Sequence, residues 1–97
     1  MADSLETEHR RLAILRHLEK SSEFTSNASI LIDVVNGVGV VTTEAQMRAA
    51  LAWLDEQELI DMVDHGHVVI AVATVRGADV ATGRANHPGV KRPTARR

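Results

Sequence analysis

Two histidines, His65 and His67, are the residues whose spacing most clearly suggests chemistry. Residues two apart on an extended strand project to the same side, so this pair could hold a metal ion such as zinc. A third ligand is not evident in the sequence, although Asp61, Asp64 and His87 are candidates by type. We interpret the segment as a polar turn and predict neither a metal nor another cofactor.

Other catalytic patterns are missing from the sequence. The chain has no cysteine, which excludes disulfides, thiolate chemistry and cysteine-based zinc sites. It also contains no glycine-rich phosphate loop, no nucleophile elbow and no pair of acidic residues in a recognisable catalytic context. We therefore predict that the protein is not an enzyme.

A second set of residues has the chemistry of nucleic-acid contact. Near the start of a predicted helix, groups that hydrogen-bond DNA are supplied by Thr42, Thr43, Gln46 and Arg48. At the end of the chain, cations that can neutralise phosphates are supplied by Lys91, Arg92, Arg96 and Arg97. These residues are the candidate contacts with double-stranded DNA.

Charge divides the chain into two parts. Residues 1–85 contain seven Lys or Arg and all thirteen acidic residues, a net charge of −6, whereas residues 86–97 contain four cations and no acid, a net charge of +4. Pro88, Gly89 and Pro93 also lie in the second part, and such a composition does not build a core. We predict a folded domain over residues 1–85 and a flexible basic tail over residues 86–97.

The predicted helix that begins after Thr43 also favours contact with another protein. A flat row of small residues lies opposite its apolar stripe, and the candidate interaction face consists of Ala45, Ala49, Ala52, Trp53 and Glu56. Four acidic residues against Arg48 give residues 44–58 a net charge of −3, which disfavours binding to phosphates. DNA binding and protein binding through this helix therefore both stay open.

That helix is the best-marked element of the chain. The sequence from Thr43 to Gln46 matches a capping box, in which each side chain satisfies a backbone donor of the first turn. The apolar stripe that follows at helical spacing consists of Met47, Ala50, Leu51 and Leu54. Next, the β-branched runs 59–63 and 68–73 flank a turn with Gly66, which predicts a hairpin. Thr74 can then cap a last helix over residues 75–84.

The front half supplies two more helices. Apolar spacing predicts a helix over residues 5–20, then a short strand at Phe24 and Thr25 that pairs with the hairpin. Ser26 or Asn27 caps a second helix ending near residues 36–37, with an apolar stripe of Ile30, Leu31, Val34, Val35 and Val38. Three helices, a hairpin wing and a C-terminal helix predict an α+β, mostly helical fold, the winged helix-turn-helix. In that fold the helix that begins after Thr43 is the recognition helix.

Several segments together resemble a known family. They are the run from Trp53 to Gln57, the hairpin, the run from Thr74 to Arg84, and the run from Pro88 to Pro93. The chain resembles small Mu-like phage and prophage proteins that are often labelled ArsR-like transcriptional regulators. The resemblance implies a winged-helix fold and a phage-encoded protein that acts in gene regulation or in assembly and DNA packaging.

We therefore predict a phage-derived DNA-binding protein, either a transcriptional regulator or a DNA-associated helper. The alternative is an interaction module that dimerises or binds another phage protein and has no DNA affinity of its own. No apolar run approaches the roughly 20 residues that cross a bilayer, and the first residues lack the basic and apolar regions of a signal peptide. We expect a cytoplasmic location in the bacterial host cell and no membrane partner.

Overall fold

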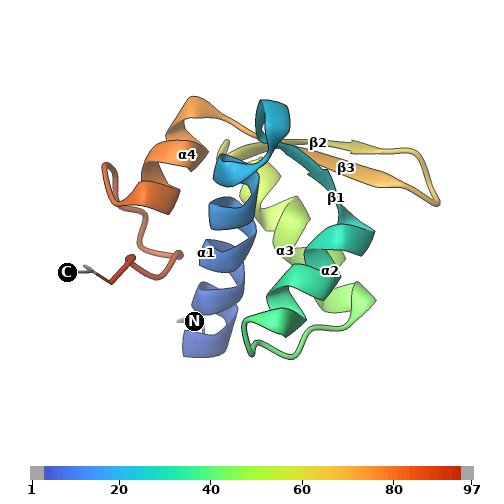
Figure 1. Cartoon of the computed structure of the whole chain (residues 1–97), viewed down its shortest axis with the longest axis horizontal. Helices are drawn as coiled ribbons and strands as arrows, with labels where there is room; N and C mark the ends of the chain where they lie inside the picture. The colour runs from blue at the N-terminus through green and yellow to red at the C-terminus, as the bar shows by residue number, and fades with distance from the viewer. Residues whose placement is uncertain (1–3, 95–97) are drawn as a thin grey trace.

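The computed structural model describes residues 4–94, shown in Figure 1. Its elements are α1 (Leu5–Lys20), the short 3-10 helix η1 (Ser22–Phe24), β1 (Thr25–Asn27), α2 (Ala28–Gly37), α3 (Glu44–Glu56), β2 (Ile60–Asp64), β3 (Val69–Ala73) and α4 (Val75–Thr82). The fold is α+β and mostly helical, as the sequence predicts. No helix within residues 4–94 is long and apolar enough to span a membrane.

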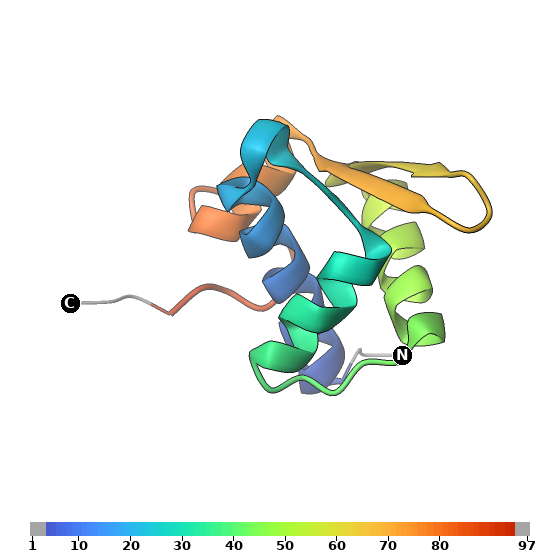
Figure 2. The same ribbon diagram turned by 45° about the vertical axis from the view of Figure 1, so that its right-hand side comes forward.

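The three strands form one antiparallel sheet in the order β1-β3-β2. β2 and β3 make the predicted hairpin, which extends beyond the helices in Figure 2. On β3 the side chains that alternate toward the helices, Val69, Ala71 and Ala73, are buried, whereas Ile70 and Val72 on the opposite face are partly buried. The prediction that a short strand pairs with the hairpin is confirmed, because β1 lies along β3.

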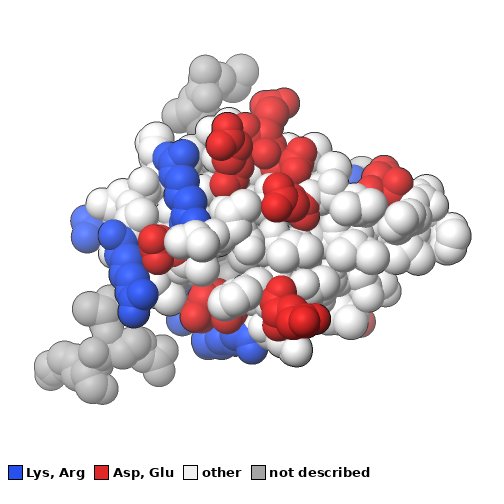
Figure 3. Space-filling view, turned by 90° about the horizontal axis from the view of Figure 1, so that it is seen from above, with Lys and Arg blue, Asp and Glu red and all other residues white. Residues whose placement is uncertain are grey.

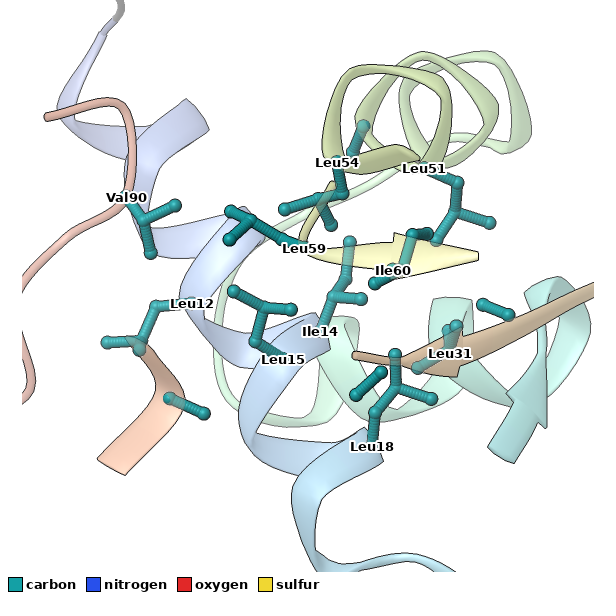
Figure 4. Packing of buried hydrophobic residues seen from close by; sticks show 14 of the residues in the cluster. Leu12, Ile14, Leu15, Leu18, Leu31, Leu51, Leu54, Leu59, Ile60 and Val90 are labelled. Carbon is teal, nitrogen blue, oxygen red and sulfur yellow. The ribbon is translucent and has the colours of Figure 1, made fainter. Parts of the chain in front are cut away.

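α1 occupies the centre of the helical layer (Figure 1) and contributes Leu12, Ile14, Leu15 and Leu18 to the core. Figure 4 shows Ile14 and Leu18 of α1 on the side that faces Leu54 of α3 and Leu31 of α2, whereas Leu15 of α1 lies toward α4. All five side chains are fully buried, and burial of one such side chain stabilises a fold by about 1.5–3 kcal/mol.

Side-chain caps fix where the helices begin. The capping box of α3 is confirmed: Thr43 Oγ1 accepts from Gln46 N at 3.1 Å, and Gln46 Oε1 accepts from Thr43 N at 2.9 Å. Asn27, not Ser26, caps α2, and Thr74 caps α4 as predicted. α4 ends at Thr82, before residue 84, because Gly83 adopts a left-handed conformation with φ of 85°.

Three apolar residues lie outside the positions predicted for them. Phe24 belongs to η1 with φ of 56° and is exposed, so β1 begins at Thr25. Ile30 and Val38 were expected in the stripe of α2, but they are 48% and 64% exposed, respectively. α2 thus packs through a narrower seam than its sequence predicts, centred on the buried Leu31 and Val35.

The C-terminal segment differs from the predicted flexible tail over the part that the structure describes. Val90 is buried in the core, and Lys91 N donates to Glu8 O of α1 at 3.3 Å. Gly89 makes the close approach possible, since a Cβ there would lie 2.5 Å from the Trp53 ring. Residues 87–91 are therefore part of the folded body, and the boundary predicted at residue 85 does not separate them from it.

Candidate interaction surface

The side chains predicted to contact DNA at the start of α3 form hydrogen bonds within the protein. Thr43 and Gln46 are exposed, but each side chain bonds the other's backbone in the capping box. Thr42 is buried, with only 6% of its surface exposed, and was wrongly predicted as a contact residue. Its Oγ1 accepts from Arg10 Nε at 2.9 Å and donates to Val40 O, so it fixes the loop before α3.

Arg48, the one cation of α3, points toward the hairpin. Its Nη2 donates to Gly66 O at 2.9 Å, and its Nη1 lies 3.4 Å from Asp64 Oδ2. Its Nε also lies 3.8 Å from Glu44 Oε1. The guanidinium therefore links α3 to the hairpin turn and has two carboxylates around it.

The predicted interaction face is largely present on the surface. Ala45, Ala49, Ala52 and Glu56 are all exposed and form one row along α3. Trp53 was assigned to the same face, but it is partly buried and turned toward α1 and the C-terminal segment. The Arg11 guanidinium carbon lies 3.6 Å from the Trp53 ring centroid, and the His87 ring meets the indole edge-on at 5.1 Å.

His87 connects the C-terminal segment to α3. Its Nε2 lies 3.0 Å from Gln57 Oε1, and its Nδ1 accepts a hydrogen bond from Gly89 N at 3.0 Å. Burial lowers the pKa of His87 from its ordinary value, and the positive charges of Arg76 and Arg11 lower that pKa further. The neutral imidazole is thus the form that fits this site.

The two residues that the sequence analysis missed are Arg10 and Arg11. Both are buried: Arg10 holds the loop before α3 through Thr42 and Val41 O, and Arg11 donates to Gly89 O at 2.9 Å. A signal existed, because Arg11 stands four residues before Leu15 and seven before Leu18, on the apolar stripe of α1. An arginine at such a position indicates a buried, partnered cation.

Charge is distributed unevenly over the molecule. Residues 28–74, which hold α2, α3 and the hairpin, contain one cation, Arg48, against seven acidic residues, a net charge of −6. Residues 75–97 contain six cations against Asp79, a net charge of +5. In Figure 3, which views the molecule from above, separate acidic side chains lie across the middle of the visible face, and most of the visible cations lie toward the end that holds α4 and the C-terminal segment.

The candidate metal ligands and the C-terminal cations do not form one site. His65 and His67 are both exposed at the hairpin turn, and no group of three or more metal-ligating side chains occurs among residues 4–94. Lys91 is partly buried and Arg92 is exposed, both far along the chain from α3. Arg96 and Arg97 lie outside the described residues.

Comparison with known proteins gives this chain a family. The uncharacterized protein gp26 of Escherichia phage Mu is 38% identical to it over 96 residues, which cover 99% of each chain. The chain belongs to the family of this phage Mu protein. The predicted resemblance to Mu-like phage proteins is thereby confirmed. No protein-family model matches the chain, and no solved structure matches it.

Proposed function

We propose that this member of the phage Mu family is a winged-helix protein-interaction module, whose α3 and hairpin bind another protein instead of reading DNA bases. The order of elements supports the winged-helix interpretation. Three helices are followed by a hairpin, and a short strand between α1 and α2 adds to the sheet beside β3. In such a fold α3 is the recognition helix and the hairpin is the wing.

The surroundings of Arg48 are the observation that carries this proposal. DNA affinity depends on cations that are available to phosphates. Arg48 is instead held by Asp64, Glu44 and the carbonyl of Gly66. The net charge of −6 over residues 28–74 also repels a polyanion from the same side of the molecule.

A protein partner suits this surface better. The exposed row of Ala45, Ala49, Ala52 and Glu56 is flat, so a second backbone can approach it closely. Two copies facing each other through this surface would bring acidic groups together, which is unfavourable. The partner is therefore another phage protein that presents a basic rim, in the cytoplasm of the host cell, and the role is binding without catalysis.

A second function is favoured by one observation, the net charge of +5 over residues 75–97. Cations of α4 and the C-terminal segment, including Lys91 and Arg92, could hold duplex DNA by its phosphates while α3 stays free. Such binding gives affinity without sequence readout. It would suit a DNA-associated helper or an auxiliary contact of a transcriptional regulator.

Fluorescence anisotropy with a labelled mixed-sequence duplex separates the two functions. We would compare the full chain with Arg48→Ala and with a full-length variant carrying Lys91→Gln, Arg92→Gln, Arg96→Gln and Arg97→Gln, at low and near-physiological salt. The proposal expects Arg48→Ala to leave DNA binding unchanged. Binding that is lost only in the second variant supports the phosphate-anchoring role, whereas binding that depends on Arg48 at near-physiological salt overturns the proposal.

Photo-crosslinking tests the protein-binding role directly. Benzoylphenylalanine is placed in the full chain at Ala49, or at Thr82 of α4 as an exposed control, in bacterial cells that express the phage genes. We expect one defined phage protein to crosslink from position 49 and not from position 82. Equal crosslinking from both positions, or none from position 49, contradicts the assignment of α3 as the docking element.

A further inference from the structure

A groove of about 410 Å³ runs between α1 and α2, on a surface formed by neither α3 nor the hairpin. Its apolar lining comes from Leu12 and Ala13 of α1, from Val34 of α2, and from Val38 and Val40 of the loop that follows. Val38 is 64% exposed, and Val34 and Val40 are partly exposed, so this part of the apolar wall is open to solvent, whereas Leu12 is buried.

The same groove has a basic rim. His9, Arg16, His17 and Lys20 line it, and their spacing places them along one side of α1. No Asp or Glu belongs to its described lining. The side chains of Arg16 and Lys20 form no hydrogen bond or ion pair with any residue in the described range, unlike the buried Arg10 and the paired Arg48.

We propose that this groove binds an acidic amphipathic helix of a partner protein. Charge complementarity identifies the occupant, because unpaired cations beside an apolar floor match a helix with carboxylates on one side and apolar residues on the other. Duplex DNA would satisfy the cations but leave the valines exposed to water. A small anionic molecule requires a site that covers most of its surface, which an open groove does not provide.

This inference concerns a surface separate from α3, so it does not rest on the function proposed above. The groove contributes a second point of attachment, which fits a chain that connects two proteins. Since Ala49 lies outside the groove lining, a variant such as Ala49→Arg leaves helix binding unchanged while it disturbs the α3 surface. Failure of one proposal is thereby distinguishable from failure of the other.

The test uses the full chain and a labelled model peptide that has leucine at helical spacing and glutamate elsewhere. A peptide with lysine in place of glutamate is the matched probe. Backbone amide NMR maps the binding site, and anisotropy measures the affinity. One groove variant combines Arg16→Glu with Lys20→Glu, and a second is Val38→Asp. The control combines Arg84→Glu with Arg92→Glu, which makes the same charge change at exposed positions outside the groove.

We expect the acidic peptide to shift the amides of Ala13, Val34 and Val40 and to bind about tenfold more weakly to the first groove variant, since each exposed ion pair is worth a few-fold in affinity. Val38→Asp weakens binding as well, and the control pair of substitutions does not. The proposal is overturned by no binding of the acidic peptide, by equal binding of the lysine peptide, or by equal loss in the control. It is also overturned if duplex DNA or laurate, titrated separately, shifts the groove amides more strongly than the peptide does.

Discussion

Arg10 and Arg11 are the residues that tie distant parts of the chain to the central helix. A buried guanidinium is tolerated only when its donors have partners and its plane packs against another group. Arg10 donates to Thr42 Oγ1 and Val41 O, and it lies 3.6 Å from Glu6 Oε1. Arg11 donates to Gly89 O and stacks on Trp53. One arginine thus holds the entry to α3, and the next holds the C-terminal segment.

At the residue scale, we predict that Thr42→Val destabilises the fold by about 1–3 kcal/mol, because the buried Arg10 Nε loses its acceptor. Valine keeps the shape of threonine, so the loss reports the hydrogen bonds of Thr42 Oγ1 with Arg10 and Val40 rather than a cavity. Urea unfolding followed by Trp53 fluorescence measures the change. Thr94→Val is the matched control at an exposed position, where we expect a change within about 0.5 kcal/mol. Equal effects of the two substitutions would show that the Arg10 bond contributes nothing.

At the scale of elements, the docking of α4 depends on Gly77. The first turn of α4 lies against the two residues that precede β2. Thr74 N donates to Leu59 O, and Thr74 Oγ1 donates to Glu58 O. A Cβ on Gly77 would collide with the backbone carbonyl of Leu59. The glycine is therefore required by packing, although it lowers helix propensity.

We predict that Gly77→Ala destabilises the protein by about 1–3 kcal/mol, since α4 must shift away from Leu59 to accommodate the methyl group. Alanine ordinarily stabilises a helix relative to glycine, so the sign of the effect is diagnostic. Gly37→Ala in α2 is the control, because nothing lies within 4 Å of the added Cβ and φ is not positive. We expect Gly37→Ala to be neutral or to stabilise by up to about 1 kcal/mol. Thermal unfolding of both variants decides between these outcomes.

The attachment of the C-terminal segment depends on pH through His87. Its Nδ1 accepts a hydrogen bond from Gly89 N. Protonation of Nδ1 would place two N–H donors opposite each other and break this bond. Because the folded pKa lies below the ordinary 6.5, the unfolded chain binds more protons in the interval between the two values. The stabilisation from His87 is therefore complete above about pH 6.5 and declines as the pH falls below it.

Comparing wild type with His87→Ala at two pH values separates the contribution of His87 from that of the other histidines, which both proteins share. We predict that the difference in unfolding free energy between wild type and His87→Ala is larger at about pH 7.5 than at about pH 5.5. Urea titrations at the two pH values measure it. Asn86→Ala, at an exposed neighbouring position without an ionisable side chain, serves as the control and is expected to give the same difference at both. A His87 difference that is constant with pH would mean that the imidazole is not held neutral.

Sequence reasoning succeeded where a feature depends on neighbours within one helical turn. The capping box at Thr43 and the caps at Asn27 and Thr74 belong to this kind, as does the hairpin around Gly66. It failed where the partner is distant: Thr42 is buried by a residue 32 positions away, and Arg11 binds Gly89 78 positions away. The candidate DNA site was wrong at Thr42 because type and spacing do not reveal such contacts.

At the scale of the whole molecule, opposite charges are separated onto two sides of one folded unit. The acidic side carries α2, α3 and the hairpin, and the basic side carries α4 and the C-terminal segment. α1 lies between them and supplies the groove with the basic rim. A molecule arranged in this way can hold different partners on different sides, which is the property expected of an adaptor.

The folded unit includes the C-terminal segment, so a chain that ends at Ala85 should be damaged rather than merely shortened. The truncation removes the buried Val90 and the hydrogen bonds to Arg11 and Gln57. We predict a loss on the order of 3 kcal/mol, from one buried aliphatic side chain and the net value of those bonds. The Trp53 emission should also shift to longer wavelength as its ring becomes exposed. The double substitution Arg92→Ala and Thr94→Ala, at exposed positions of the same segment, is the control, and it should change neither quantity. If the chain ending at Ala85 is as stable as the full chain, the contacts of residues 87–91 contribute nothing to folding, and the segment is free to act as the tail that its composition suggested.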